Sequence, residues 1–311
     1  MTRGMAMPVP EISARGPVLV FGGPYGNLQA TRAVLEEARA LGLSPDHILC
    51  TGDVIAYCAE PAETVDLIRA AGIRVVAGNC EEQIAGDADD CGCGFGEGSA
   101  CDALSAAWYP FAKARIDADA KRWMAELPRR IDLVFEIGGG RTLRLAAVHA
   151  APSSINRFLF ASSPEAEIAM TNADGVVAGH CGLPFTRMAG GRLWHNAGVV
   201  GMPANDGTPR VWFSLMTPED GGLRIEHRAL AYDHEAAASA MAAARLPAGY
   251  REALSSGLWP NMDILPKRER EARGQPIAET GIVWTPVRDD GSPGLVMSAN
   301  GREDRGLSVS P

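Results

Sequence analysis

The chain has 311 residues, 46% of them hydrophobic, and its 29 Lys and Arg against 38 Asp and Glu give a formal net charge of −9. A chain of this length and composition can bury a large core, so pervasive disorder is excluded, and the acidic balance gives no electrostatic support for a nucleic-acid patch. We find neither a secretory signal pattern nor an apolar run of about eighteen residues, and we therefore expect a cytoplasmic protein that does not contact a membrane.

The first half of the chain alternates short apolar runs of β type with helical patterns, which is typical of βαβ units and a parallel sheet. In chain order the pattern predicts a strand near 18–22, a helix over 27–41, a strand over 47–51, a helix over 61–71 and a strand over 73–77. Both helices carry apolar residues on one face, so each is expected to cover a sheet.

A stretch rich in Gly and Asp over 87–100 predicts a loop above the surface or above a site. The remaining elements expected in chain order are helices over 101–113 and 117–126, β segments over 131–137 and 142–148, a helix near 164–171, strands near 175–179, 192–196, 210–216 and 222–229, and helices over 233–246 and 249–258. This order predicts a mixed sheet in the second half. For the domains we expect a leader over 1–16, one domain over 17–260 and an extended or disordered tail over 261–311.

Polar side chains follow four of the predicted strands, at the point where each strand ends. Asp53 lies in "CTGDVIAY", Asn79 and Cys80 in "VVAGNCEE", His149 in "AAVHAAP" and His180 in "VVAGHCGLPF". Open α/β sheets bind their ligands at such ends, so we expect these residues at one edge of a sheet. Asp, Asn and two His suit a divalent or trivalent ion such as manganese, iron or zinc.

The order of these motifs resembles the calcineurin-like metallophosphoesterases, above all their small bacterial phosphodiesterase-type members. The motifs are Gly-Asp at 52–53, Gly-Asn at 78–79, a strand ending in His149, Gly-His at 179–180 and the turn "NAGVVGMP" at 196–203. The similarity covers roughly residues 17–245. It implies an α/β fold, a four-layer α-β-β-α sandwich of two mixed sheets.

The resemblance also implies that half of a two-metal site is missing. In the family, two ions share one Asp, and the ligands particular to the first ion fall here on Gly23, Tyr25 and Gly182. The ligands of the second ion are retained as Asp53, Asn79, His149 and His180. We therefore expect one metal ion per chain, beside a position that has been emptied or rebuilt.

The resemblance implies a metal-dependent hydrolase of phosphomonoesters or phosphodiesters that takes a small phosphorylated substrate or ligand. The residues expected to carry catalysis are Asp53, Asn79, Cys80, His149 and His180. Cys80 falls where the family has a His that assists proton transfer, a role that a thiol replaces only in part.

Two alternatives remain open. In one, the protein is a non-catalytic descendant that binds a phosphorylated ligand or senses metal or redox state. In the other, Cys80 and Cys181 rebuild the lost half as thiolate ligands, for example to iron, together with Cys91 and Cys93 on the glycine-rich loop, and the site performs non-phosphoryl chemistry.

Several of these residues also have an ordinary structural role to fill. The odd count of seven cysteines argues against a disulfide framework, and Cys50 and Cys58 are predicted to be packing residues. Asn79 is predicted to cap the following helix, with Glu82 at the capping-box position. The histidines outside the motifs show no ligand spacing and are predicted to have ordinary roles.

Overall fold

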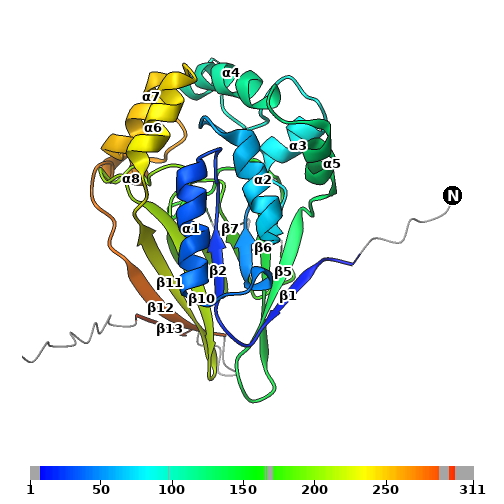
Figure 1. Cartoon of the computed structure of the whole chain (residues 1–311). Coiled ribbons are helices and arrows are strands. Elements are labelled where there is room, and N and C mark those ends of the chain that lie inside the picture. Colours follow the sequence, from blue (N-terminus) through cyan, green and yellow to red (C-terminus); the bar gives the residue numbers. More distant parts are fainter. Residues whose placement is uncertain (1–7, 97, 165, 167–170, 287–293, 298–311) are drawn as a thin grey trace, which may run out of the picture.

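Two mixed β-sheets pack face to face, with helices outside them (Figure 1). The computed structural model of the chain describes all residues except 1–7, 97, 165, 167–170, 287–293 and 298–311. The strands are β1 Glu11–Ala14, β2 Val18–Phe21, β3 Ile48–Cys50, β4 Arg74–Val75, β5 Arg130–Glu136, β6 Thr142–Val148, β7 Gly175–Ala178, β8 Phe185–Ala189, β9 Arg192–Asn196, β10 Val211–Glu219, β11 Gly222–Leu230, β12 Thr280–Thr285 and β13 Gly294–Met297.

The first sheet has the strand order β1-β5-β6-β7-β9-β8, and the second has the order β13-β12-β11-β10-β2-β3-β4. In the second sheet, β2, β3 and β4 are parallel, as the βαβ pattern predicts, and the antiparallel run from β10 to β13 continues the sheet from β2. In the first sheet, β6, β7 and β9 are parallel, while β5 and β8 run antiparallel to their neighbours β6 and β9. Both sheets are therefore mixed, and the expected fold class is confirmed.

The helices are α1 Leu28–Ala40, α2 Pro61–Ala71, α3 Asn79–Ala85, α4 Ala100–Lys113, α5 Ala118–Glu126, α6 His234–Ala243, α7 Ala248–Ser256 and α8 Lys267–Glu271, with a short 3-10 helix η1 over Pro45–His47. The α1 helix begins where Asn27 Oδ1 accepts a hydrogen bond from Ala30 N at 3.1 Å, a side-chain cap that satisfies a free backbone donor. The α1 and α2 helices lie over the outer face of the second sheet (Figure 1).

Strand β2 shows how one short apolar run serves two cores. Val18 and Val20 face the other sheet and pack in the core between the two sheets. Leu19 and Phe21 point the other way, into the core beneath the helices. A strand buried on both faces needs apolar residues throughout, which is why this segment is continuous rather than alternating in hydrophobicity.

The structure corrects the predicted ends of the domain. Residues 11–14 form β1, which pairs in parallel with β5 inside the first sheet, so this part of the expected leader belongs to the fold. Beyond residue 260, β12 pairs with β11 and extends the second sheet. Both strands are short, and each pairs with a strand that is far away in the sequence. Local hydrophobicity patterns do not reveal such pairing.

Other elements differ in detail. The strand expected over 73–77 is reduced to Arg74–Val75, and β8, which forms a hairpin with β9, is not predicted by the sequence. Of the helix expected near 164–171, residues 165 and 167–170 lie outside the described residues. Within the described part of the chain, no helix combines the length and the apolarity needed to cross a bilayer.

Candidate metal centre

The four predicted ligands lie directly beyond the carboxyl ends of four strands. Asp53 follows β3 and Asn79 follows β4 in the second sheet, whereas His149 follows β6 and His180 follows β7 in the first. The expectation that all four emerge from one edge of a single sheet is therefore wrong. The site forms between the sheets, where two strands of each sheet end side by side.

Asp53 is held in an unusual backbone conformation that aims its carboxylate at the two histidines. Its φ is +58°, a left-handed value that non-glycine residues seldom adopt. Its Oδ1 accepts a hydrogen bond from Cys80 N at 3.2 Å, and its Oδ2 lies 3.3 Å from His149 Nε2. One oxygen thus anchors the side chain, while the other faces the site.

His149 is fixed in one tautomer by the backbone. Its Nδ1 lies 2.6 Å from Thr51 O, and because a carbonyl oxygen only accepts, this nitrogen carries the hydrogen. In the neutral form of the ring, the Nε2 lone pair therefore points into the site. A ligating His commonly shows this arrangement, in which the outer nitrogen donates to a backbone carbonyl.

Asn79 is oriented in the same manner. Its Nδ2 donates to Cys91 O at 2.8 Å, which places its Oδ1 3.1 Å from His149 Nε2. The glycine-rich loop that carries Cys91 thereby turns the amide oxygen toward the site. The loop predicted over 87–100 has a positioning role here, since it folds back onto the ligand set.

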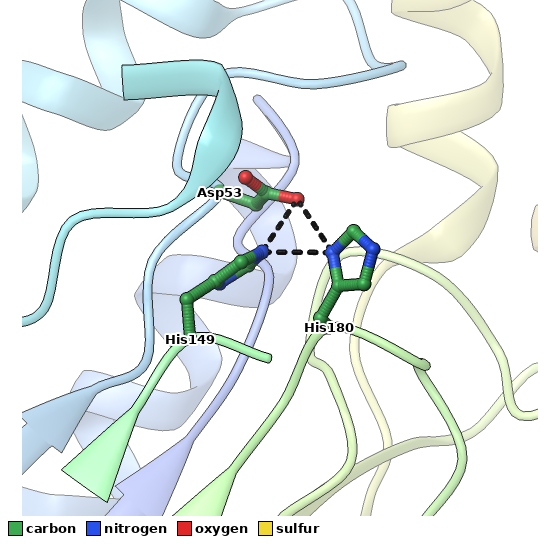
Figure 2. A group of neighbouring side chains, drawn as sticks. All are labelled: Asp53, His149 and His180. Atoms are coloured by element: carbon green, nitrogen blue, oxygen red, sulfur yellow. Dashed lines mark hydrogen bonds and ion pairs between the residues drawn. The ribbon is translucent and has the colours of Figure 1, made fainter. Parts of the chain in front are cut away.

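The electron-pair donors of the centre converge on one point. Asp53 Oδ2, His149 Nε2 and His180 Nδ1 form a triangle with sides of 2.8, 3.3 and 3.9 Å (Figure 2). A point within this triangle lies about 2 Å from each atom, which is the distance at which zinc binds imidazole nitrogen and carboxylate oxygen. A cation between three or four facing lone pairs would satisfy all of them at once, so the residues present fit a metal ion.

The protonation of the site suits a metal. Burial opposes the charged form of Asp53, but the neighbouring imidazoles hold the pKa of its carboxyl well below its usual range. Burial likewise disfavours the charged form of both rings; the Asp53 charge outweighs it at His149, whose pKa is raised, whereas burial prevails at His180, whose pKa is lowered. Asp53 is therefore a carboxylate and His180 a neutral imidazole near neutral pH, which are the forms that bind metal, whereas at His149 a metal ion competes with a proton.

Glu81 holds the ligand loop in place and was not found by sequence reasoning. Its Oε2 accepts from Asp53 N at 2.8 Å and from Gly78 N at 2.9 Å, and its Oε1 accepts from Val54 N at 2.8 Å. Burial raises the pKa of Glu81 to about 7, with the Asp53 charge acting in the same direction. The predicted capping role of Asn79 and Glu82 is also wrong, because α3 begins at Asn79 and Glu81 occupies the capping position.

The cysteines lie beside the centre rather than in it. Neither Cys80 nor Cys181 belongs to the converging group that the described residues form, which is Asp53, His149 and His180. Burial raises the pKa of both thiols, that of Cys181 to about 12, so neither is a thiolate near neutral pH. Cys91 and Cys93 form a disulfide, which the cysteine count did not predict. The proton-transfer role of Cys80 stays a prediction.

Aromatic rings fill the positions where the resemblance implies ligands of a first ion. A side chain on Gly23 would collide with the ring of Tyr25, which is itself buried. At Gly182, whose φ is +77°, a Cβ would come within 3.2 Å of the Trp259 indole. Aromatic side chains therefore occupy the space on this side of the centre.

Two mixed sheets packed face to face, with a donor set for a metal ion where their strands end, define an α/β sandwich of the metallophosphoesterase class. Residues 25–220, more than half of the chain, match the family described as the calcineurin-like phosphoesterase superfamily domain, and the chain belongs to this superfamily.

Individual relatives agree with this assignment. An uncharacterized protein of Methanocaldococcus jannaschii is 25% identical over 256 residues, which span 77% of this chain and 98% of that protein. A crystal structure of a metallophosphoesterase from Sphaerobacter thermophilus superposes with a TM-score of 0.58 at 20% identity and covers 79% of this chain and all of its own. A hypothetical protein from Pyrococcus horikoshii OT3 gives a TM-score of 0.64 at 17% identity, over 78% of this chain and 99% of its own. These two superpositions establish the shared fold.

Proposed function

We propose that this protein is a metal-dependent hydrolase of small phosphate esters that works with one metal ion held by Asp53, Asn79, His149 and His180. The observation that carries the proposal is the convergence of Asp53 Oδ2, His149 Nε2 and His180 Nδ1 within 2.8 to 3.9 Å of one another. The family assignment supports the phosphoester part of the proposal.

When bound, a divalent ion at this centre would supply Lewis acidity toward a phosphoryl oxygen and lower the pKa of a coordinated water. The ligand set contributes one carboxylate and three neutral donors, so a divalent ion keeps net positive charge toward an incoming anion. This charge balance favours a phosphorylated substrate.

The chain's own residues fix the geometry before substrate arrives. Thr51 O orients the His149 ring, Cys91 O orients the Asn79 amide, and Cys80 N restrains one oxygen of Asp53. Ligands held in this way need little reorganisation when the metal ion and the substrate bind. Preorganised polar groups of this kind stabilise the charge that develops in a reaction.

The test measures ester hydrolysis and bound metal in the same protein samples. Protein stripped of metal and reloaded with Mn²⁺ is assayed for p-nitrophenol released from p-nitrophenyl phosphate and from bis(p-nitrophenyl) phosphate. We expect metal-dependent activity on at least one ester, and we expect Asp53→Asn and His149→Gln to lose about a hundredfold or more of it.

The matched control is His47→Gln. His47 lies on η1, before β3 begins, at the opposite end of that strand from Asp53, and its Nδ1 contacts only Ser44 Oγ at 3.0 Å. This variant should keep wild-type activity. Wild-type protein that binds one ion per chain yet hydrolyses neither ester faster than Mn²⁺ alone would overturn the hydrolase and leave the non-catalytic binder.

A further inference from the structure

A cavity of about 60 Å³ opens beside the metal centre and is walled mainly by aromatic rings. Its volume is several times the ~10–15 Å³ that one water molecule needs and less than half of the ~150 Å³ of a closed cavity that holds benzene, so an aryl ring would enter it only in part. The residues that matter to the argument are Tyr25, Tyr57, Phe158, Tyr250, Trp259 and His180. Among the described residues that line it, there is no Lys, Arg, Asp or Glu.

The cavity and the metal centre share a wall. His180 contributes Nδ1 to the converging donors and also lines the cavity. The Phe158 ring lies over His180, with their ring centroids 4.3 Å apart. A molecule anchored at the centre by a phosphate group would therefore reach the aromatic walls with the atoms bonded next to that group.

The aromatic walls are braced by their neighbours. The Tyr57 ring lies 4.7 Å from both the Tyr25 ring and the Tyr250 ring, between centroids. The Trp259 indole is held by its Nε1, which donates to Pro203 O at 2.6 Å. Rings packed against one another in this way form a preorganised surface rather than side chains that must rearrange around a ligand.

The walls also carry polar groups, namely three tyrosine hydroxyls, the Asn261 amide and the His180 ring, and two further polar groups are engaged by the protein itself. The Trp259 N–H is used by Pro203 O, and Cys181 Sγ donates to Leu183 O at 3.7 Å. A group with many hydrogen-bonding edge atoms, such as a nucleobase, needs a partner for each of them, because a polar atom left unpaired costs binding free energy. A plain aryl ring carries no such requirement and gains from ring faces and edges around it.

We propose that this cavity binds the aryl group of an aryl phosphate ester whose phosphate group is held at the metal centre. The inference rests on the proposed function for the phosphate end and on the cavity alone for the organic end. It assigns to substrate recognition the space where the family resemblance implies the first ion, since Tyr25 and Gly182 line the cavity.

The experiment is calorimetric titration of Mn²⁺-loaded protein with methylphosphonate and with phenylphosphonate, which share a head group and differ only in the organic group. We expect phenylphosphonate to bind at least about tenfold more tightly than methylphosphonate. In Ile264→Trp, where a larger side chain fills the cavity, we expect this preference to disappear while methylphosphonate binds as in the wild type. Ile264 lines the cavity and is half-buried, so a larger side chain can be accommodated there. Ile264→Phe is a second variant with a smaller increase in size. Ile264→Val is the matched control, and it should keep the preference for phenylphosphonate.

The outcomes separate the two proposals. Equal affinity of wild-type protein for the two phosphonates would overturn the aryl site and leave the metal centre intact. A preference that survives in both Ile264→Trp and Ile264→Phe would also overturn it, since the ring would then bind elsewhere. Failure of methylphosphonate to bind at all would count against the metal-dependent phosphate site itself.

Discussion

Two pairs of buried histidines lie in this protein, and they differ in what faces their nitrogen atoms. His149 and His180 have ring centroids 4.8 Å apart, and His195 and His227 have centroids 4.7 Å apart. In the first pair, His149 Nε2 faces His180 Nδ1, a carboxylate oxygen and an amide oxygen, none of which can donate to it except the other ring.

In the second pair, every ring nitrogen has a hydroxyl partner. Thr186 Oγ1 lies 2.8 Å from His195 Nδ1 and 3.0 Å from His227 Nε2. Ser214 Oγ lies 2.9 Å from His195 Nε2 and 3.2 Å from His227 Nδ1. A hydroxyl both donates and accepts, so this closed ring of four contacts satisfies two neutral imidazoles without an ion.

The comparison teaches that burial and proximity of histidines do not by themselves indicate a metal site. What distinguishes the first pair is that its ring nitrogens face a carboxylate oxygen, an amide oxygen and each other rather than hydroxyl groups. The second pair is a structural link between the sheets, because His195 lies on β9 of the first sheet and His227 on β11 of the second.

The difference between the two histidine pairs is tested by making the same substitution in each pair. We expect His180→Gln to reduce bound manganese from about one ion per chain to less than about a tenth, because one of the converging donors is lost. His195→Gln should keep the ion. Metal content after dialysis, measured by mass spectrometry, checks both, and equal loss in the two variants would contradict the distinction.

A smaller effect is expected from Glu81, which acts on the centre only through the backbone. We expect Glu81→Gln to weaken manganese binding by about 10-fold to 100-fold, because an amide NH₂ in place of a carboxylate oxygen would face backbone donors. Glu82→Gln is the matched control, since its side chain pairs with Arg129 at the surface. Calorimetric titration with Mn²⁺ gives the affinities of both variants. Identical affinities would show that Glu81 does not support the metal centre.

The hydroxyl-bonded pair predicts a loss of stability in acid. Burial lowers the pKa of His227 to about 4, so the folded protein stays unprotonated there while the unfolded chain takes up a proton below about pH 6.5. Between pH 7.5 and 5.0 this group alone should lower the free energy of unfolding by about 2 kcal/mol.

Urea denaturation of metal-free wild-type protein and of His227→Gln at both pH values measures that contribution. Above pH 6.5 the variant should have the lower free energy of unfolding. At pH 5.0 the difference in free energy of unfolding between the two proteins should be smaller by about 2 kcal/mol. A gap that does not change with pH would show that His227 is protonated in the folded state.

The smallest effect is expected from the free cysteines beside the centre. A Cys80→Ser, Cys181→Ser double variant should keep its full metal content, because neither sulfur belongs to the converging donors. Metal analysis of the purified variant tests this, and loss of the ion would revive the thiolate hypothesis.

Much of the site could be predicted from the sequence because its ligands follow strands with strong local signals. Asp53, Asn79, His149 and His180 all come directly after apolar β runs, and the structure places each beyond its strand. Glu81 could not be predicted, because it sits one position before an equally acidic Glu82 and only the turn of α3 decides which carboxylate is buried. The strands β1 and β8 have weak local patterns, and patterning missed both; β1 pairs with the distant strand β5, whereas β8 forms a hairpin with its neighbour β9.

The sequence by itself determined the alternation of strands and helices and the chemical type of each ligand, because both follow from local hydrophobicity and residue identity. Only the tertiary structure decided that the ligands come from two different sheets, that Tyr25 and Trp259 fill the space beside them, and that one pair of histidines is satisfied by hydroxyls while the other is not. These outcomes depend on contacts between segments that are far apart in the chain. Such contacts are determined by packing of the whole domain and not by any single segment.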